Sequence, residues 1–242
     1  MSGHGGSRHI KRMAVPSLIS HQRKAATFVQ KPSPGRHALG ESLALSTLLR
    51  DVLGLVEDTR QARKLLVEGK IIVDGKVARS PKLCVGLMDV IEIPSLNARY
   101  RLVVSGGKLK PLPVSKDEGH VKLCKVTGKA AVAQGKVQLN LHDGRSQLIE
   151  REEDRFTPGD TIKLSVPKQK IEGFIKLERG ARCYVYRGRH AGAVATLQDL
   201  VERAGSKEAD ARLKMDDGQE LITVKSYLFA VDKEFRLNVA QS

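Results

Sequence analysis

The chain of 242 residues is long enough for two or three domains, and its 40% hydrophobic content can fill their cores, although only 4% of its residues are aromatic. Its formal net charge of +15 favours a nucleic-acid partner over an anionic membrane surface, or over a soluble enzyme that is merely basic, because contact with phosphates releases counterions. Three scattered cysteines exclude a CxxC zinc motif and a disulfide framework, and no apolar run is long enough for a membrane span or a signal peptide.

The first forty residues carry seven Lys or Arg, no Asp or Glu, and four of the seven histidines. A segment of this composition buries too little apolar surface to fold alone, and it suits an extension that becomes ordered on phosphates. We therefore expect residues 1–42 to form a basic extended arm, and the rest of the chain to fold without residues 1–40. The histidines His4, His9, His21 and His37 have spacings that match no metal-ligand motif. A tail without a function is the alternative.

Two short helices are predicted next. Apolar residues recur at helical spacing over residues 43–55, and Gly54 is placed to end that helix. A second helix is predicted to begin after Asp58 or Thr59 and to run to about Glu68, with Gln61 in a capping-box position and Gly69 as the stop. Its apolar face is Ala62, Leu65 and Leu66. Its other face carries Arg60, Arg63 and Lys64, whose mutual repulsion a polyanion would remove.

A tight hairpin is predicted directly after the second helix. Ile71, Ile72 and Val73 precede Asp74-Gly75, the dipeptide typical of a two-residue β-turn, and Lys76-Val77 follow. A strand over residues 90–93 completes a small sheet. Together with the two helices, this makes a compact α+β module whose hairpin edge is basic.

The rest of the chain is predicted to be β-structure. Short apolar runs separated by turn signals indicate a small β domain over residues 100–166, with a hairpin at Asp143-Gly144. A further β domain begins at residue 171. It contains two strands around the sequence RGRHAG, a helical turn at QDLVERA, and two more strands that Asp217-Gly218 opens.

The second helix and its hairpin resemble the S4 RNA-binding domain. The residues that carry this resemblance are Thr59 to Arg63, Leu65, Gly69, Lys70 to Lys76, and Asp89 to Ile91. Because this domain also occurs in pseudouridine synthases and some aminoacyl-tRNA synthetases, it implies RNA binding without settling the function.

The whole chain is similar to ribosomal protein family S4e of the small subunit of archaea and eukaryotes, at an archaeal length. Seven stretches follow the order of that family: HIKR at His9, PSPG at Pro32, LRD at Leu49, VDGKV at Val73, GLMDVI at Gly86, LHDGR at Leu141 and GD at Gly159.

The C-terminal third is similar to a KOW motif, an RNA- and protein-binding β element. Gly180, Val185, Gly188, Gly192 and Val194 match it. Two positions depart from the KOW pattern: His190 stands where the motif usually has Asn, and Ala195 stands where it usually ends in Gly. If Ala195 had a positive φ, its backbone would be strained.

These resemblances imply an α+β multidomain protein. The expected parts are the arm over residues 1–42, an S4-type domain over 43–105, a central β domain over 106–170 and a KOW-type, SH3-like β-barrel over 171–242. They also imply a cytoplasmic, structural rRNA-binding protein with neighbouring ribosomal proteins as partners. We expect no catalysis, cofactor, metal, membrane contact, small-molecule substrate or homo-oligomer. The side chains expected on RNA are Arg60, Arg63, Lys64, Lys70, Lys76, Arg79, Lys82, Arg8, His9, Lys11, Arg12, Arg36, Arg187, Arg189 and His190.

Two alternatives remain at the level of sequence. An RNA-modifying enzyme would need a catalytic constellation, but Asp143 and Asp160 lie in turn sequences, and His120, His142 and His190 have no evident partner. A KOW-type transcription or translation factor would have less need of a polybasic arm. The low aromatic content favours recognition of the backbone and grooves of folded RNA over base stacking on Tyr100, Phe156, Tyr184 or Tyr186.

Overall fold

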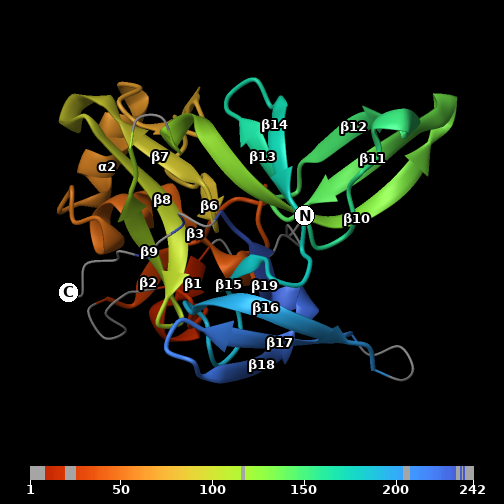
Figure 1. Cartoon of the computed structure of the whole chain (residues 1–242). Coiled ribbons are helices and arrows are strands. Elements are labelled where there is room, and N and C mark those ends of the chain that lie inside the picture. The colour runs from red at the N-terminus through yellow and green to blue at the C-terminus, as the bar shows by residue number, and fades with distance from the viewer. Residues whose placement is uncertain are drawn as a thin grey trace, which may run out of the picture.

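The computed structural model describes residues 9–19, 26–115, 118–203, 208–232, 235 and 237. Within these ranges the strands form three five-stranded antiparallel sheets and two small two-stranded ones. Figure 1 shows the three larger sheets as separate lobes, with the first and second side by side and the third below them. None of the helices in the described ranges is long and apolar enough to cross a membrane.

The first sheet and its helices correspond to the predicted α+β module. The first predicted helix is short, with β3 (Ser42–Ala44), α1 (Leu45–Thr47) and the π-helical turn η3 (Leu48–Val52) in its place. The second helix, α2 (Thr59–Val67), matches its prediction, with Asp58 as the N-cap residue and Gly69 at φ +71°. The strands follow as β4 (Ile72–Val73), β5 (Lys76–Val77), β6 (Cys84–Gly86), β7 (Val90–Ile93), β8 (Ala98–Ser105) and β9 (Lys108–Pro113), in the sheet order β5-β4-β7-β8-β9, while β6 pairs with β3.

The hairpin between β4 and β5 forms because of its two turn residues. Asp74 and Gly75 have φ values of +50° and +71°, the left-handed conformation that a two-residue hairpin turn demands. A Cβ on Gly75 would lie 2.8 Å from the backbone nitrogen of Pro167. The tip of the hairpin therefore docks closely against the second sheet, and only glycine fits there.

The second sheet is built on one long strand. It comprises β10 (Val121–Val132), β11 (Lys136–Leu141), β12 (Ser146–Glu150), β13 (Thr161–Ser165) and β14 (Ile171–Ile175), in the order β12-β11-β10-β13-β14. The predicted hairpin at Asp143-Gly144 joins β11 to β12. Figure 1 shows β10 and β11 reaching outward past β13, away from the first sheet.

The third sheet comprises β15 (Arg182–Val185), β16 (Val194–Val201), β17 (Asp210–Met215), β18 (Glu220–Val224) and β19 (Leu228–Ala230), in the order β18-β17-β16-β15-β19. The helical turn predicted at QDLVERA is wrong, because its first four residues continue β16 through a bulge. Ala195 lies within β16 and has no positive φ, so the strain considered there does not arise. The two strands predicted after Asp217-Gly218 are β18 and β19, and the dipeptide also joins β18 to β17, a strand that the sequence did not predict.

Two expected domain boundaries fall inside sheets. The boundary at 105/106 cuts the turn of the β8–β9 hairpin, so the first sheet continues to Pro113. The boundary at 170/171 separates β14 from β13, although the two strands are paired. Short helical turns lie at the sheet edges and connections, namely η1 (Arg12–Ala14), η2 (Leu39–Glu41), η4 (Pro94–Leu96), η5 (Glu118–His120), η6 (Ala133–Gly135), η7 (Arg151–Glu153) and η8 (Lys225–Tyr227).

The described part of the N-terminal segment is not a free arm. β1 (His9–Lys11) pairs with β2 (Phe28–Gln30), and the backbone nitrogen of Leu109 in β9 donates to the carbonyl oxygen of Leu18 at 2.7 Å. Val15, Ile19 and Val29 are at most 6% exposed and belong to the core beneath the first sheet. The composition of the segment did not predict this packing, because a few apolar side chains are enough to anchor a segment when the rest of the chain supplies most of the core.

The packed arm gives a prediction for stability. Val29→Ala should lower the free energy of unfolding by about 2 kcal/mol, because it removes two methyl groups from a filled core. Denaturant unfolding would measure it. The exposed Val67 of α2 provides the matched control, and Val67→Ala should change stability by less than about 0.5 kcal/mol. Equal effects of the two variants on stability would mean that the N-terminal segment does not pack into the core and is an extended arm.

Candidate nucleic-acid interface

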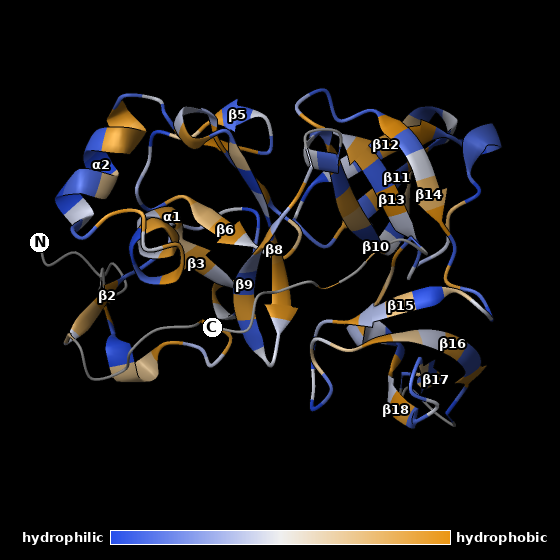
Figure 2. Cartoon of the chain, turned by 60° about the vertical axis from the view of Figure 1, so that its left-hand side comes forward, coloured by the Kyte–Doolittle hydropathy of each residue, from blue (hydrophilic) through white to orange (hydrophobic). Residues whose placement is uncertain are grey.

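The helix α2 presents the basic face that its sequence predicts. Ala62 and Leu66 are fully buried against the first sheet, whereas Arg60, Arg63 and Lys64 are exposed. These three cations form no ion pair with any residue in the described ranges. Figure 2 shows α2 at the outer end of the molecule, with hydrophilic residues along it, on the side opposite β11 and β12. The face is therefore open to a large partner.

The hairpin extends this surface. Lys76, Arg79 and Lys82 are exposed, and Lys70 is half exposed with its ammonium group 2.7 Å from Glu68. A Cβ on Gly69 would lie 3.3 Å from the side chain of Val77, so the C-terminal end of α2 lies beside β5. The structure thus brings the predicted residues of α2 and of the following hairpin together on one side of the first sheet.

The turn between β15 and β16 supplies a second, smaller basic group. Arg189 is exposed and His190 is half-buried, while Arg187 forms an ion pair with Glu41. A Cβ on Gly192 would lie 3.0 Å from the backbone nitrogen of Gly106, so this turn packs against the β8–β9 turn. These residues lie at the junction of the first and third sheets and not next to α2.

The predicted basic residues of the arm are only partly available. Arg12 is 5% exposed, and its guanidinium lies 3.1 Å from the carboxylate of Asp51, so it is not available at the surface for the expected RNA contact. Arg36 is half-buried, 2.6 Å from Asp74. Lys11 is exposed. Arg8 and the side chain of His9 lie outside the described residues.

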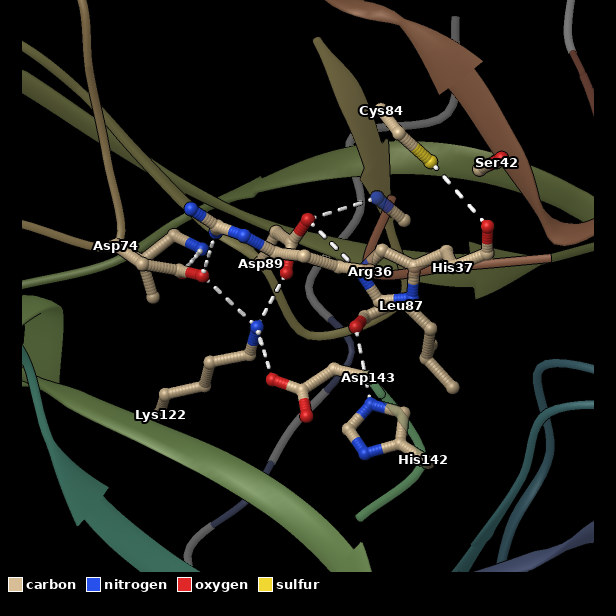
Figure 3. A network of polar contacts seen from close by, with 12 residues as sticks. Arg36, His37, Ser42, Asp74, Cys84, Leu87, Asp89, Lys122, His142 and Asp143 are labelled. Carbon is tan, nitrogen blue, oxygen red and sulfur yellow. Dashed lines mark hydrogen bonds and ion pairs between the residues drawn. The ribbon is translucent and has the colours of Figure 1, made fainter. Parts of the chain in front are cut away.

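Behind the hairpin lies a buried charge cluster that the sequence reading did not foresee (Figure 3). The ammonium group of Lys122, in β10, lies 2.9 Å from Asp74, 2.5 Å from Asp89 and 2.9 Å from Asp143, and all four side chains are fully buried. Arg145 also contacts Asp74 at 2.5 Å. One lysine therefore joins the hairpin turn, the loop before β7 and the β11–β12 turn.

The cluster also fixes the end of the arm. His37 lies 3.0 Å from Asp89, whose carboxylate accepts a hydrogen bond from the backbone nitrogen of Gly86. A Cβ on Gly86 would lie 2.6 Å from the ring of His37, so glycine leaves the space that the ring fills. Arm, first sheet and second sheet therefore meet at a single set of ionic contacts.

Electrostatics keep this cluster charged. Burial alone would lower the pKa of Lys122, but the neighbouring carboxylates Asp89, Asp74 and Asp143 outweigh burial and raise it. Burial would raise the pKa of Asp89, but Lys122 and His37 outweigh it and lower that pKa. The groups stabilise each other's ionised forms, which makes each of them costly to remove.

Asp74, Asp89, Asp143 and Arg145 belong to the motifs VDGKV, GLMDVI and LHDGR, but the sequence did not predict their ion pairs. Asp143 does accept a hydrogen bond from the backbone nitrogen of Arg145, as a turn former would, and Asp160 accepts one from that of Thr157. The ionic role of Asp143 was missed. Lys122 stands in an ordinary strand sequence, and nothing in its spacing marks it as buried.

Cys124, His142 and Asp143 bring potential metal-ligand atoms within 4.8 Å of one another. Internal contacts account for this arrangement. Asp143 pairs with Lys122, and the thiol of Cys124, whose pKa burial raises, donates to Asp143 at 3.7 Å. The Nδ1 atom of His142 lies 3.2 Å from the backbone nitrogen of Lys125, and its Nε2 lies 3.3 Å from the carbonyl oxygen of Leu87. Both ring nitrogens are thus engaged.

His142 gives a prediction for pH dependence. Burial lowers its pKa to about 4 from the ordinary 6.5, and the nearby cation Lys122 also lowers it, although Asp143 opposes this. Between these values the unfolded chain binds a proton that the folded chain does not, so stability should fall by up to about 3 kcal/mol as the pH drops from 6.5 to 4.

Urea unfolding at a series of pH values would measure this loss. His142→Gln, which keeps an amide able to donate and accept, should flatten the slope in that window. A slope unchanged by the substitution would assign the acid sensitivity to other groups.

The chain is similar to known proteins over nearly its whole length. The S4 domain profile matches residues 45–91, and the profile of ribosomal family S4e matches residues 90–171. The small ribosomal subunit protein eS4 of Methanocaldococcus jannaschii is 39% identical over 241 residues, covering 97% of this chain and 98% of that one. The eS4 protein of Ignicoccus hospitalis is 39% identical over 239 residues, covering 95% and 93%. The crystal structure of the 30S ribosomal protein S4e from Thermoplasma acidophilum aligns with a TM-score of 0.68 at 31% identity, covering 80% of this chain and 96% of that one.

Proposed function

The chain belongs to ribosomal family S4e, and from this membership we propose that it binds folded small-subunit rRNA through the basic surface of α2 and the β4–β5 hairpin. It is a structural constituent of the small ribosomal subunit in the cytoplasm, where it takes part in translation as part of a ribonucleoprotein. It is not an enzyme, since this family is a structural component of the subunit.

One observation carries the assignment of the interface. Arg60, Arg63 and Lys64 share one exposed face of α2, without an ion pair within the described ranges, and Lys76, Arg79 and Lys82 continue the surface. Elsewhere the basic side chains of Arg12, Arg36, Lys122 and Arg145 are paired with carboxylates. Guanidinium groups bind phosphates as planar forks and ammonium groups bind them as point charges, so the unpaired set suits an RNA backbone.

The remaining predicted contacts are secondary. Lys11 and Arg189 are exposed and extend the proposed contact set. Lys70, Arg36 and Arg187 bind RNA only if they leave or share their carboxylate partners, and His190 is half-buried. The proposal therefore gives α2 and the hairpin the main role. Neighbouring ribosomal proteins are the other partners, and a single copy of the chain occupies each subunit.

We extend the proposal to the third sheet as a KOW-type, SH3-like element. Gly180, Gly188 and Gly192 have φ values of +84°, +81° and +102°, which glycine adopts most readily and which match the KOW pattern of the sequence. The sheet has its own core around Cys183, Leu197 and Leu213. On this proposal the three domains are separated at residues 114–120 and 176–181.

Cosedimentation tests the proposal. The purified chain, added to small subunits depleted of it, should remain with the subunits through sucrose gradients at high salt, as a permanent component does. Release at moderate salt would favour a factor that only visits the ribosome, which is the alternative that the KOW resemblance allows.

A further inference from the structure

The turn between β13 and β14, residues 166–170, carries two cations outside the surface described so far. Lys168 and Lys170 are exposed, and neither forms an ion pair with a residue that the structure describes. The turn has the sequence VPKQK and contains no carboxylate. Exposed ammonium groups without a counter-charge attract a polyanion, so this turn is a candidate for phosphate contacts.

The turn packs against the β4–β5 hairpin. A Cβ on Gly75, at the tip of the hairpin, would lie 2.8 Å from the backbone nitrogen of Pro167 and 2.9 Å from its Cδ. The other side of the hairpin reaches α2, because Val77 lies beside Gly69. Figure 2 shows β5 between α2 and the strands of the second sheet. The exposed Lys76 of β5 therefore connects the basic face of α2 with the lysines of the turn.

Hydrogen bonds fix the backbone of the turn. The backbone nitrogen of Gln169 donates to the carbonyl oxygen of Ser165 at 2.6 Å, and that of Ser165 donates to the carbonyl oxygen of Lys170 at 2.9 Å. The side-chain amide of Gln147, in β12, donates to the carbonyl oxygen of Gln169. A backbone that is already ordered loses little conformational entropy on binding, so the two lysines are presented to a partner at low cost.

The buried charge cluster holds the hairpin and the second sheet in one arrangement. Lys122 of β10 and Arg145, which precedes β12, both pair with Asp74, the first turn residue of the hairpin. The relative position of Lys76 and the lysines of the β13–β14 turn is thereby set by the fold. A partner that contacts both groups meets a surface that is preorganised.

The opposite end of the second sheet has the opposite charge. The turn begins at Ser165, which pairs with Val121 at the start of β10, whereas Glu150 pairs with Lys136 at the far end of the sheet. Four acids gather at that far end, namely Glu150, Glu152, Glu153 and Asp154. They compensate the nearby cations, since Lys136 lies 3.3 Å from Glu150 and Lys129 lies 2.5 Å from Asp154. A polyanion is therefore drawn to the end of the sheet that carries the turn.

We propose that the β13–β14 turn is part of the rRNA-binding surface, and that Lys168 and Lys170 contact phosphates of the same RNA that lies on α2 and the hairpin. The RNA backbone then crosses from the first sheet to the second. These contacts position the RNA and do not read its bases, because ammonium groups bind phosphates as point charges. The inference rests on the proposed rRNA-binding function and extends it beyond the S4-type domain.

The test uses the full chain with the double substitution Lys168→Gln and Lys170→Gln. The slope of log affinity for small-subunit rRNA against log salt should fall in magnitude by about 1.4–1.8, since each lost phosphate contact removes about 0.7–0.9. The matched control is Arg151→Gln with Arg155→Gln, which also removes two exposed cations without an ion pair in the described ranges, at the acidic end of the sheet. The control should leave the slope nearly unchanged.

The outcomes separate the two proposals. Wild-type protein that fails to bind the rRNA overturns the proposed function itself. A turn variant that keeps the wild-type slope, while charge reversal of Arg60, Arg63 and Lys64 reduces it, overturns only the extension to the second sheet. Equal losses of slope in the turn variant and its control also overturn the extension, because net charge would then explain both.

Discussion

Lys122→Met should destabilise the protein by about 3–5 kcal/mol, the usual cost of removing one partner from a buried ionic group. Methionine has a similar length and no charge, so it leaves Asp74, Asp89 and Asp143 buried with too few cations. Because the cluster joins the arm to two sheets, the loss should lower the stability of both sheets together. Chemical denaturation at pH 7 measures it.

Two controls identify the mechanism. Lys168 is exposed and without an ion pair in the described ranges, so Lys168→Met should be nearly silent. Adding Asp89→Asn to Lys122→Met should recover part of the lost stability, since it removes one buried carboxylate that no longer has its lysine partner. The deficit of Lys122→Met should also shrink at acid pH, where the buried carboxylates of the variant become protonated. A deficit independent of pH and of the second substitution would mean that only packing was lost.

Reversing the charges of Arg60, Arg63 and Lys64 to glutamate should produce the largest loss of function. Each lost phosphate contact lowers the slope of log affinity against log salt by about 0.7–0.9, so the triple variant should lose about 2–3 from the slope. The fold should survive, because all three side chains are exposed and have no ion pair with the residues that the structure describes. Binding to small-subunit rRNA between 50 and about 300 mM salt measures the slope.

A second reversal separates this specific surface from overall charge. Arg212 and Lys214 are exposed on β17, where they stand opposite Asp199 and Glu220 on the neighbouring strands. Arg212→Glu with Lys214→Glu changes the net charge by −4, against −6 for the triple variant, but should alter the slope little. If the two variants lose slope in proportion to their change of net charge, attraction to overall charge explains the binding, and α2 has no special role.

Local features were predictable because local chemistry determines them. The period of Ala62, Leu65 and Leu66 predicted both the extent of α2 and the exposure of its basic face. The dipeptides Asp74-Gly75 and Asp143-Gly144 predicted two hairpins, since few other residues adopt the required turn.

Tertiary features were not predictable from the same patterns. The arm appeared to be an extension because its composition is basic, yet Val15 and Val29 complete a core that distant residues begin. The segment QDLV carries no strand period, but pairing of β16 with β17 overrides its preference. Lys122 pairs with Asp74 and Asp89, which lie 48 and 33 residues before it, and with Asp143, which lies 21 residues after it. Such contacts depend on the fold, and no residue spacing in the sequence predicts them.

The most direct measurement is crosslinking between protein and RNA inside intact small subunits, followed by identification of the modified peptides. We expect rRNA crosslinks within residues 59–82, which span α2, the hairpin and Lys82, and few on the outer strands β17 and β18. Crosslinks confined to the third sheet, with Arg60, Arg63 and Lys64 facing solvent or protein carboxylates, would contradict the assignment of this surface to rRNA.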